Sequence, residues 1–337
     1  LEHTVATNSG AGTLAYTAPE CFKGKLTQQS DQYSLAVTYY HLRTGRLLFK
    51  GDPAQVMYAH LETEPDLSAL PPAERAVLTR ALSKEPGKRW PNCREFVREL
   101  LDAAKPGFLC EEAMLCLIVG QLDQAIRLFD EVVQLNPKHS FAYYLRGLAW
   151  LRKSEGRSDH EACDKAIKDF DQAIRLDPEY SSAYERRAAA WYCKKDYDKA
   201  IRDFDDAIRL SSIADGDDSD DEEDKRSTAE LFYCRGTAWA HKWDYDRALH
   251  DFDEAIRLDP SVAMYYFLRG KAWADHEDYD KAIQDFDQAV RLDSQNAAIF
   301  NSRGIAWSSK GDCDKAIKDY GAAIGLDPTN PTIYYNR

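Results

Sequence analysis

Residues Asp278–Asp293 read DYDKAIQDFDQAVRLD, and close copies of this stretch recur along the chain. Asp196–Leu210 reads DYDKAIRDFDDAIRL, and Asp244–Asp259 reads DYDRALHDFDEAIRLD. The alanine of the DKA step and its variants falls at residues 125, 166, 200, 248, 282 and 316, so neighbouring copies are 41, 34, 48, 34 and 34 residues apart. A period of 34 residues, interrupted by two inserts, therefore organises this part of the chain.

Each copy predicts a helix, because an aromatic follows the alanine by four residues and a small or short apolar residue follows it by seven. A second helix precedes each copy from the second onward. It carries an aromatic four residues before a Gly or Ala and a Trp three residues after it: Tyr143/Gly147/Trp150, Tyr184/Ala188/Trp191, Phe232/Gly236/Trp239, Tyr266/Gly270/Trp273 and Phe300/Gly304/Trp307. Small residues let two helices approach closely, and prolines 137, 178, 260 and 328 end the repeated helices.

This pattern resembles the tetratricopeptide repeat over about residues 106–337. The resemblance implies an all-α solenoid of antiparallel helix pairs, with about six repeats over residues 108–337 and the start of a seventh at Pro331–Arg337. The first repeat, at about residues 106–137, has Ala113 and Cys116 where the other copies have Gly or Ala and Trp. End repeats are often atypical because they cap the stack, so we expect this repeat to cap the array or to dock on the preceding domain.

Composition narrows the classes of function. The 337 residues are 44% hydrophobic, and the net charge of −13 argues against nucleic acid as a partner. Residues 1–105 carry 13 basic and 12 acidic groups, which leaves −14 on the rest of the chain. The eight cysteines form no CxxC pair and the eight histidines no HExxH spacing, so no metal site is predicted and a cytoplasmic location is expected. No apolar run has the length of a membrane span.

Residues 1–102 lack the 34-residue period and carry four short motifs: GTLAYTAPE from Gly12, SDQYSL from Ser30, TGRLLF from Thr44 and KEPGKRW from Lys84. In this order they resemble the C-terminal half of a bacterial-type, eukaryotic-like serine/threonine protein kinase domain, from the end of the activation segment to the last helix. Helices are expected at about 32–44, 53–62, 72–83 and 92–102. Residues 103–107 (AAKPG) are expected to be a linker.

The resemblance assigns roles to individual residues. The loop that receives the substrate residue after the phosphoacceptor corresponds to Gly12, Thr13, Leu14, Ala15 and Tyr16. Thr13 matches the threonine that contacts the catalytic aspartate.

Three further residues have structural roles by the same resemblance. Glu20 matches the glutamate that pairs with the arginine matched by Arg89, and Asp31 matches the aspartate that accepts hydrogen bonds from the catalytic loop. Kinases of this family often carry activating phosphates where Thr4, Thr7 and Ser9 stand, and an unmodified polar loop is the alternative.

The Gly-rich loop, the VAIK lysine, the HRD catalytic loop and the DFG metal site do not occur in this sequence. No catalytic residue and no cofactor is therefore assigned to the chain, and it is expected to be inactive alone, with ATP and Mg²⁺ used by an intact parent protein. We expect the chain to be an internal piece of such a parent, and a gene that has lost its catalytic half is the alternative. Without the missing half, Asp31 and the apolar side chains of Tyr33, Val37 and Tyr40 are expected to lose their cover and destabilise residues 1–102.

Two inserts interrupt the array. The extra residues near 154–161 are expected to lengthen a turn. The insert at about residues 211–228 includes ADGDDSDDEED, whose like charges predict a disordered loop. A calcium site there is disfavoured because the EF-hand spacing is absent.

The first helix of each repeat lines the concave groove of such an array. Three residues before the small position stand Tyr144, Glu185, Tyr233, Phe267 and Asn301, and one residue after it stand Leu148, Ala189, Thr237, Lys271 and Ile305. This mixture of aromatic and few charged residues suits protein or peptide ligands held by aromatic anchors. Packing of the same aromatics against the next repeat is the alternative.

Two functions follow from these features. The first is a fragment of a serine/threonine protein kinase whose repeats recruit its protein substrates or regulators. The second is a non-catalytic repeat scaffold that carries a kinase relic. An enzyme built into the repeats themselves has little support, because their many Asp residues are expected on polar helix faces.

Overall fold

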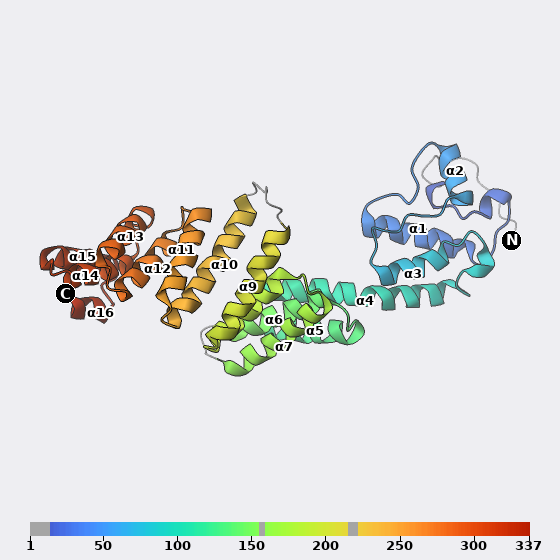
Figure 1. The fold of residues 1–337 in the computed structure, drawn as a ribbon. Helices are drawn as coiled ribbons and strands as arrows, with labels where there is room; N and C mark the ends of the chain where they lie inside the picture. Colours follow the sequence, from blue (N-terminus) through green and yellow to red (C-terminus); the bar gives the residue numbers. More distant parts are fainter. Residues whose placement is uncertain (1–13, 155–158, 215–221) are drawn as a thin grey trace. The chain divides into compact units, whose positions relative to one another are not determined.

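The computed structural model describes residues 14–154, 159–214 and 222–337. Within these ranges the protein contains helices and no strand, so the all-α prediction is confirmed. The chain divides into two compact units, Leu1–Glu112 and Ala113–Arg337, and each is described by itself (Figure 1). The predicted phosphosites Thr4, Thr7 and Ser9 and the loop residues Gly12 and Thr13 lie outside the described residues.

The first unit is a small helical domain with short connections. Its elements are η1 (Leu14–Tyr16), η2 (Cys21–Lys23), α1 (Ser30–Thr44), α2 (Pro53–Glu62), α3 (Pro72–Ala81), η3 (Pro86–Lys88) and α4 (Cys93–Ile118), which continues into the second unit. The sequence determines the start of α2, because Pro53 occupies its first turn and Asp52 forms a capping box with Gln55. Helices α1, α2 and α3 lie within two residues of their predicted bounds.

The expected loss of cover over α1 is wrong. Tyr33 and Val37 are fully buried and Tyr40 nearly so, in a core completed by Leu78 and Phe96. The hydroxyl of Tyr33 also has a buried hydrogen-bond partner on α2. The reason is that α3, α4 and the segment between α2 and α3 supply enough apolar surface to close this face of α1.

The predicted linker at residues 103–107 is helical and belongs to α4. Phe96, Leu100 and Ala104 are buried at i, i+4 and i+8, so the apolar stripe of α4 continues into the segment expected to be a linker. Pro106 lies inside the helix and does not end it. A buried stripe thus outweighs the tendency of proline to interrupt a helix.

The second unit is a series of antiparallel helix pairs (Figure 1). The end of α4 and α5 (Leu122–Leu135) form the first pair. The others are α6 (Ser140–Ser154) with α7 (His160–Leu176), α8 (Ser181–Cys193) with α9 (Tyr197–Ala214), α10 (Glu222–His241) with α11 (Tyr245–Leu258), α12 (Ala263–Asp275) with α13 (Tyr279–Leu292) and α14 (Ala297–Ser309) with α15 (Cys313–Leu326), followed by α16 (Pro331–Asn336).

Close packing within a pair depends on the predicted small positions. A Cβ atom added at Gly270 of α12 would lie 2.8 Å from Cε1 of Phe286 on α13, and one at Gly304 of α14 would lie 2.7 Å from Cε1 of Tyr320 on α15. Phe286 is 1% exposed. The repeated aromatics therefore fill the space that the missing side chains leave.

The acidic insert is predicted to be a disordered loop over residues 211–228, of which 215–221 lie outside the described residues. Residues 211–214 continue α9, and 222–228 begin α10, so the expected disordered loop over 211–228 is wrong at both ends. Acidic residues are favourable in the first turn of a helix, and Arg226 anchors α10 through a 3.3 Å contact between its Nε and Oδ2 of Asp259. The insert near residues 154–161 is predicted to lengthen a turn. Its last two residues, His160 and Glu161, belong to α7 after the cap residue Asp159, and residues 155–158 lie outside the described residues.

Candidate functional site

The segment Leu14–Tyr16, predicted to shape a substrate loop, is fixed by two histidines. The carbonyl oxygen of Ala15 lies 3.1 Å from Nε2 of His60, and the hydroxyl of Tyr16 lies 2.6 Å from Nδ1 of His41. Sequence reasoning missed both histidines, because neither belongs to a motif of fixed spacing. The segment is therefore held in one geometry by side chains of α1 and α2.

His60 is fully buried in an aromatic cage. Its Nδ1 lies 3.0 Å from the hydroxyl of Tyr33, and the rings of Phe22 and Phe49 are also near it. Burial lowers the pKa of His60 from its ordinary value of 6.5 to about 4. The ring is thus neutral at physiological pH, with one nitrogen bonded to Tyr33 and the other to Ala15.

Glu20 and Arg89 form a buried, two-armed ion pair. Both contacts, from the two terminal nitrogens of Arg89 to the two carboxylate oxygens of Glu20, are 2.8 Å long. Ser30 donates to the same carboxylate at 2.7 Å, and Nε of Arg89 donates to the carbonyl of Ser83 at 2.8 Å. Burial acts in the opposite direction, but the hydrogen bonds from Arg89 and Ser30 lower the pKa of Glu20 below its usual value. The pair joins two segments that are 69 residues apart in sequence.

Asp31 stands on an exposed face of α1, contrary to the expectation of a buried carboxylate. Leu35 and Leu42 follow it at i+4 and i+11 and are 39% and 81% exposed. The buried polar residue next to Asp31 is Gln32, whose side-chain amide donates to the Trp90 carbonyl and accepts from the Trp90 amide. One side of α1 is thus packed and the opposite side carries apolar residues in solvent.

Except for Lys271 and Ile305, the predicted groove residues of the repeats are half-buried rather than free. The Tyr144 ring lies 4.9 Å from that of Tyr180 and the Tyr233 ring 5.3 Å from that of Tyr265. Of the others, Phe267 contacts Phe286 of its own pair, Asn301 accepts from Asn336 and Glu185 is paired with Arg186. Lys271 is exposed. The alternative that these aromatics pack between repeats thus describes most of them.

A ladder of ion pairs, which the sequence reasoning missed, runs along the array. In each repeat from the second to the sixth, an arginine of the first helix donates to two carboxylates. Its Nε and one terminal nitrogen hold the first Asp of the following helix's DFD or DYG triplet at 2.5–2.9 Å. Its other terminal nitrogen holds an Asp of the preceding repeat at 2.6–2.7 Å. The members are Asp130–Arg146–Asp169, Asp171–Arg187–Asp203, Asp205–Arg235–Asp251, Asp253–Arg269–Asp285 and Asp287–Arg303–Asp319.

The ladder corrects the expectation that the Asp residues lie on polar helix faces. Asp169, Asp203, Asp251, Asp285 and Asp319 are each at most 6% exposed. Burial raises the pKa of Asp285, although Arg269 acts in the opposite direction. The sequence signal that could have found the ladder is the spacing of 16 residues between the arginine and this aspartate in the last four repeats.

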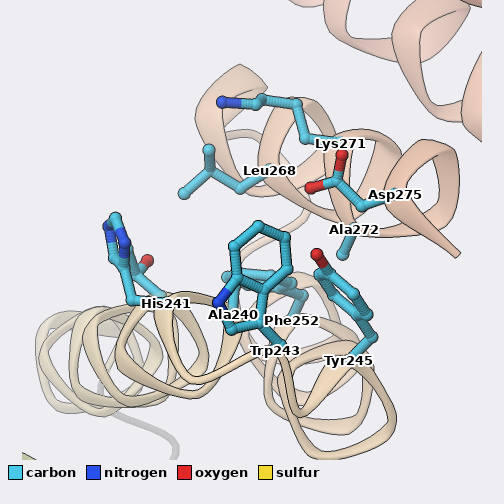
Figure 2. A pocket seen from close by; sticks show the side chains of 10 residues that line it. Ala240, His241, Trp243, Tyr245, Phe252, Leu268, Lys271, Ala272 and Asp275 are labelled. Atoms are coloured by element: carbon cyan, nitrogen blue, oxygen red, sulfur yellow. The ribbon is translucent and has the colours of Figure 1, made fainter.

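A cavity of about 200 Å³ opens between α10 and α12. Figure 2 shows Leu268 and Lys271 of α12 on one side and His241 and Trp243 on the other. The walls also include Ala240, Phe252 and Ala272, and Thr237, Tyr245 and Asp275 complete the lining. Two of the predicted groove residues, Thr237 and Lys271, thus line this cavity.

Among the described ranges of the chain, no group of three or more His, Cys, Asp or Glu side chains is arranged to hold a metal ion. Over the same residues, no helix is long and apolar enough to cross a membrane.

Comparison with protein families identifies the repeats. Residues 117–162, 157–217 and 244–297 match a model described as tetratricopeptide repeat, and residues 308–337 match one described as TPR repeat. Together these ranges cover more than half of the chain.

Similarity to curated proteins covers a shorter part. PknF, a serine/threonine-protein kinase of Mycobacterium tuberculosis, is 39% identical over 105 residues, which are 28% of this chain and 21% of PknF. The kinase PksC of Streptomyces coelicolor is 38% identical over 100 residues, or 28% of this chain and 18% of PksC. PrkC of Bacillus subtilis is 29% identical over 104 residues, which are 29% of this chain and 16% of PrkC. The chain spans about a fifth of the length of these relatives.

Similarity to solved structures lies in the fold alone. PilW, described as a widely conserved type IV pilus biogenesis factor, aligns with a TM-score of 0.56 at 12% identity, over 68% of this chain and 97% of PilW. PilF of Pseudomonas aeruginosa aligns with a TM-score of 0.54 at 14% identity, over 69% of this chain and 97% of PilF.

Proposed function

Because the chain belongs to the tetratricopeptide-repeat family, we propose that its repeats bind protein partners and present them to a serine/threonine protein kinase, of which residues 1–102 are the C-terminal part. A repeat array joined directly to a kinase domain raises the effective concentration of a bound protein at that domain. The observation that carries the kinase assignment is the buried pair of Glu20 and Arg89.

Two further observations support the assignment. The alignments with curated kinases are 88–105 residues long, close to the length of the first unit. The segment Leu14–Tyr16 is rigidly bonded to His41 and His60, as a segment that positions a substrate should be. The curated relatives are serine/threonine-protein kinases of bacteria, and we place the proposed function in the cytoplasm.

The chain offers no residues that match the family's nucleotide- or metal-binding motifs. Bound ATP and Mg²⁺ would supply the phosphoryl group and the charge stabilisation of its transfer. No residue present here fits those roles, so no step of the transfer is assigned to this chain. Its proposed part in the reaction is to position the protein substrate.

The test begins with the genomic sequence upstream of the codon for Leu1. If it encodes the HRD and DFG motifs, the extended protein is expressed and assayed for ATP-dependent phosphorylation of a generic basic protein. Thr13→Ala should reduce this activity, because Thr13 matches the threonine that contacts the catalytic aspartate. Thr79→Ala, on the exposed side of α3, serves as the control and should leave it unchanged. An extended protein without activity, or an upstream region without these motifs, contradicts the kinase proposal.

A second candidate is a non-catalytic scaffold that carries a kinase relic. The closed core around Tyr33, Val37 and Phe96 favours it, because the first unit buries its own apolar surface. A start codon close to the codon for Leu1, together with protein capture by the chain in the absence of phosphorylation, would select this function.

A further inference from the structure

Trp243 has an unusual place in the array. It lies in the turn between α10 and α11 with a φ of 63°, in the left-handed region that is costly for a bulky side chain. Its side chain is nevertheless 78% exposed. The same turn position in other repeats holds Gly120, Lys195, Glu277 or Gly311, all with positive φ. A large ring is therefore kept where packing does not require it, and strained residues of this kind concentrate at functional sites.

The cavity beside Trp243 has the size of one side chain. Its volume of about 200 Å³ is below the range of 300–1,000 Å³ that is usual for cofactors and drug-sized ligands. Its walls are mainly apolar, with Ala240, Phe252, Leu268 and Ala272 beside the Trp243 ring. An aromatic or long aliphatic side chain fits both the volume and the lining.

The charges at the rim indicate what should stand next to that side chain. Burial, and secondarily the nearby Asp275, raises the pKa of Tyr245, and Asp275 is a hydrogen-bond partner of this hydroxyl. Lys271 is exposed, and none of the described residues gives it a carboxylate partner. At physiological ionic strength charges more than about 8 Å away are screened. Lys271 and Asp275 both line the cavity, and because Asp275 is already bonded to Tyr245, Lys271 is the one left to pair with a ligand. A carboxylate is its complement.

We propose that this cavity, formed by α10, the turn at Trp243 and α12, binds a peptide segment of a partner protein through an aromatic or long aliphatic side chain that is followed by an acidic residue. The apolar side chain packs between Trp243 and Leu268, and the acidic one pairs with Lys271. This inference rests on the proposed protein-binding function of the repeats and gives it a location and a partner chemistry.

The test uses the full chain and three fluorescein-labelled peptides in fluorescence polarisation: SFEES, the charge-reversed SFKKS and the anchorless SSEES. SFEES should bind the most tightly and SSEES should not bind. In a sample with ¹⁵N-labelled tryptophan, unlabelled SFEES should shift the indole signal of Trp243, one of seven tryptophans. The signal is assigned by its absence in Trp243→Phe. Equal binding of all three peptides, or shifts confined to other tryptophans, would overturn the proposal.

Variants separate binding from folding. Lys271→Glu should weaken SFEES about fivefold, the factor that corresponds to an exposed ion pair of 1 kcal/mol. Ile305→Glu places a glutamate at the same position of the next repeat, where no lysine is lost, and should change affinity less than twofold. Trp243→Gly should abolish binding while the melting temperature rises, because glycine adopts the left-handed conformation freely.

Equal effects of Lys271→Glu and Ile305→Glu, or undiminished affinity in Trp243→Gly, refute the proposal. If the chain captures cellular proteins and Trp243→Gly captures them equally well, the repeats bind partners at another site, and only the cavity assignment fails. If the chain captures none, the proposed function itself fails.

Discussion

Removal of the Asp285 carboxylate should destabilise the array far more than removal of the Asp253 carboxylate, although both bind Arg269. Asp285 accepts two bonds, of 2.8 and 2.6 Å, and its side chain is 8% exposed, whereas Asp253 accepts one bond and is 59% exposed. Asp285→Ala removes two charge-assisted hydrogen bonds at a buried site and leaves the guanidinium of Arg269 partly unpaired. It should therefore lower the free energy of unfolding by about 3 kcal/mol. Asp253→Ala removes only an exposed ion pair and should lower the free energy of unfolding by about 0.5 kcal/mol.

The assay for this prediction is native-state hydrogen exchange of the amides in α12 and α13, because a linear array opens locally rather than all at once. The chain offers a natural reference, since Gly321 occupies the position of Asp253 in the last repeat. The double variant Arg269→Met/Asp285→Leu should recover to within about 1 kcal/mol of the unmodified protein, because no buried charge is left unpaired. Equal costs for Asp285→Ala and Asp253→Ala, or a double variant as unstable as Asp285→Ala, would refute the reasoning.

Three further predictions concern single side chains. Glu20→Gln should destabilise the first unit by about 3 kcal/mol in urea unfolding, because Arg89 loses its buried carboxylate; a change below 1 kcal/mol would contradict this. The pKa of His60 is lowered to about 4, so its contribution to stability is present above pH 6.5 and is lost as the pH falls towards 4, by up to about 3 kcal/mol; His60→Phe should flatten this dependence, and an unchanged slope would argue against the assignment. Trp243→Gly should raise the stability of α10 and α11 by about 0.5 kcal/mol, and slower exchange of their amides would report it.

The repeated elements could be predicted from the sequence because each constraint recurs. The alanine, the aromatic four residues later and the Gly or Ala of the preceding helix each appear several times in one register, and a close-packed helix pair needs all three. The ladder of Arg and Asp also recurs, but the two aspartates of each DFD triplet have the same composition and give no sign that one is buried and the other is not. Only the structure shows that Asp285 is buried whereas Asp287 is not.

The errors lie where the pattern does not repeat. Pro106 and the acidic residues at the start of α10 are local signals for a break, but each lies within a helix that has buried residues, such as Ala104 in α4 and Ala229 in α10. The two histidines that hold Leu14–Tyr16 are single residues whose partners are remote in sequence, so no spacing marks them. The cavity at Trp243 is formed by one turn and by α12 of the next repeat. No sequence pattern predicts that these two lie side by side.

The most direct test of the account is whether the repeats direct phosphorylation. The protein extended upstream to include the HRD and DFG motifs that the proposal expects there is compared with a version that ends at Gly120, just after α4. Both are assayed on a generic basic protein and on an extract of the source organism. The account predicts equal rates on the generic protein and the loss, in the shortened version, of phosphorylation of a distinct set of extract proteins. An identical set of phosphorylated proteins for both versions would contradict it.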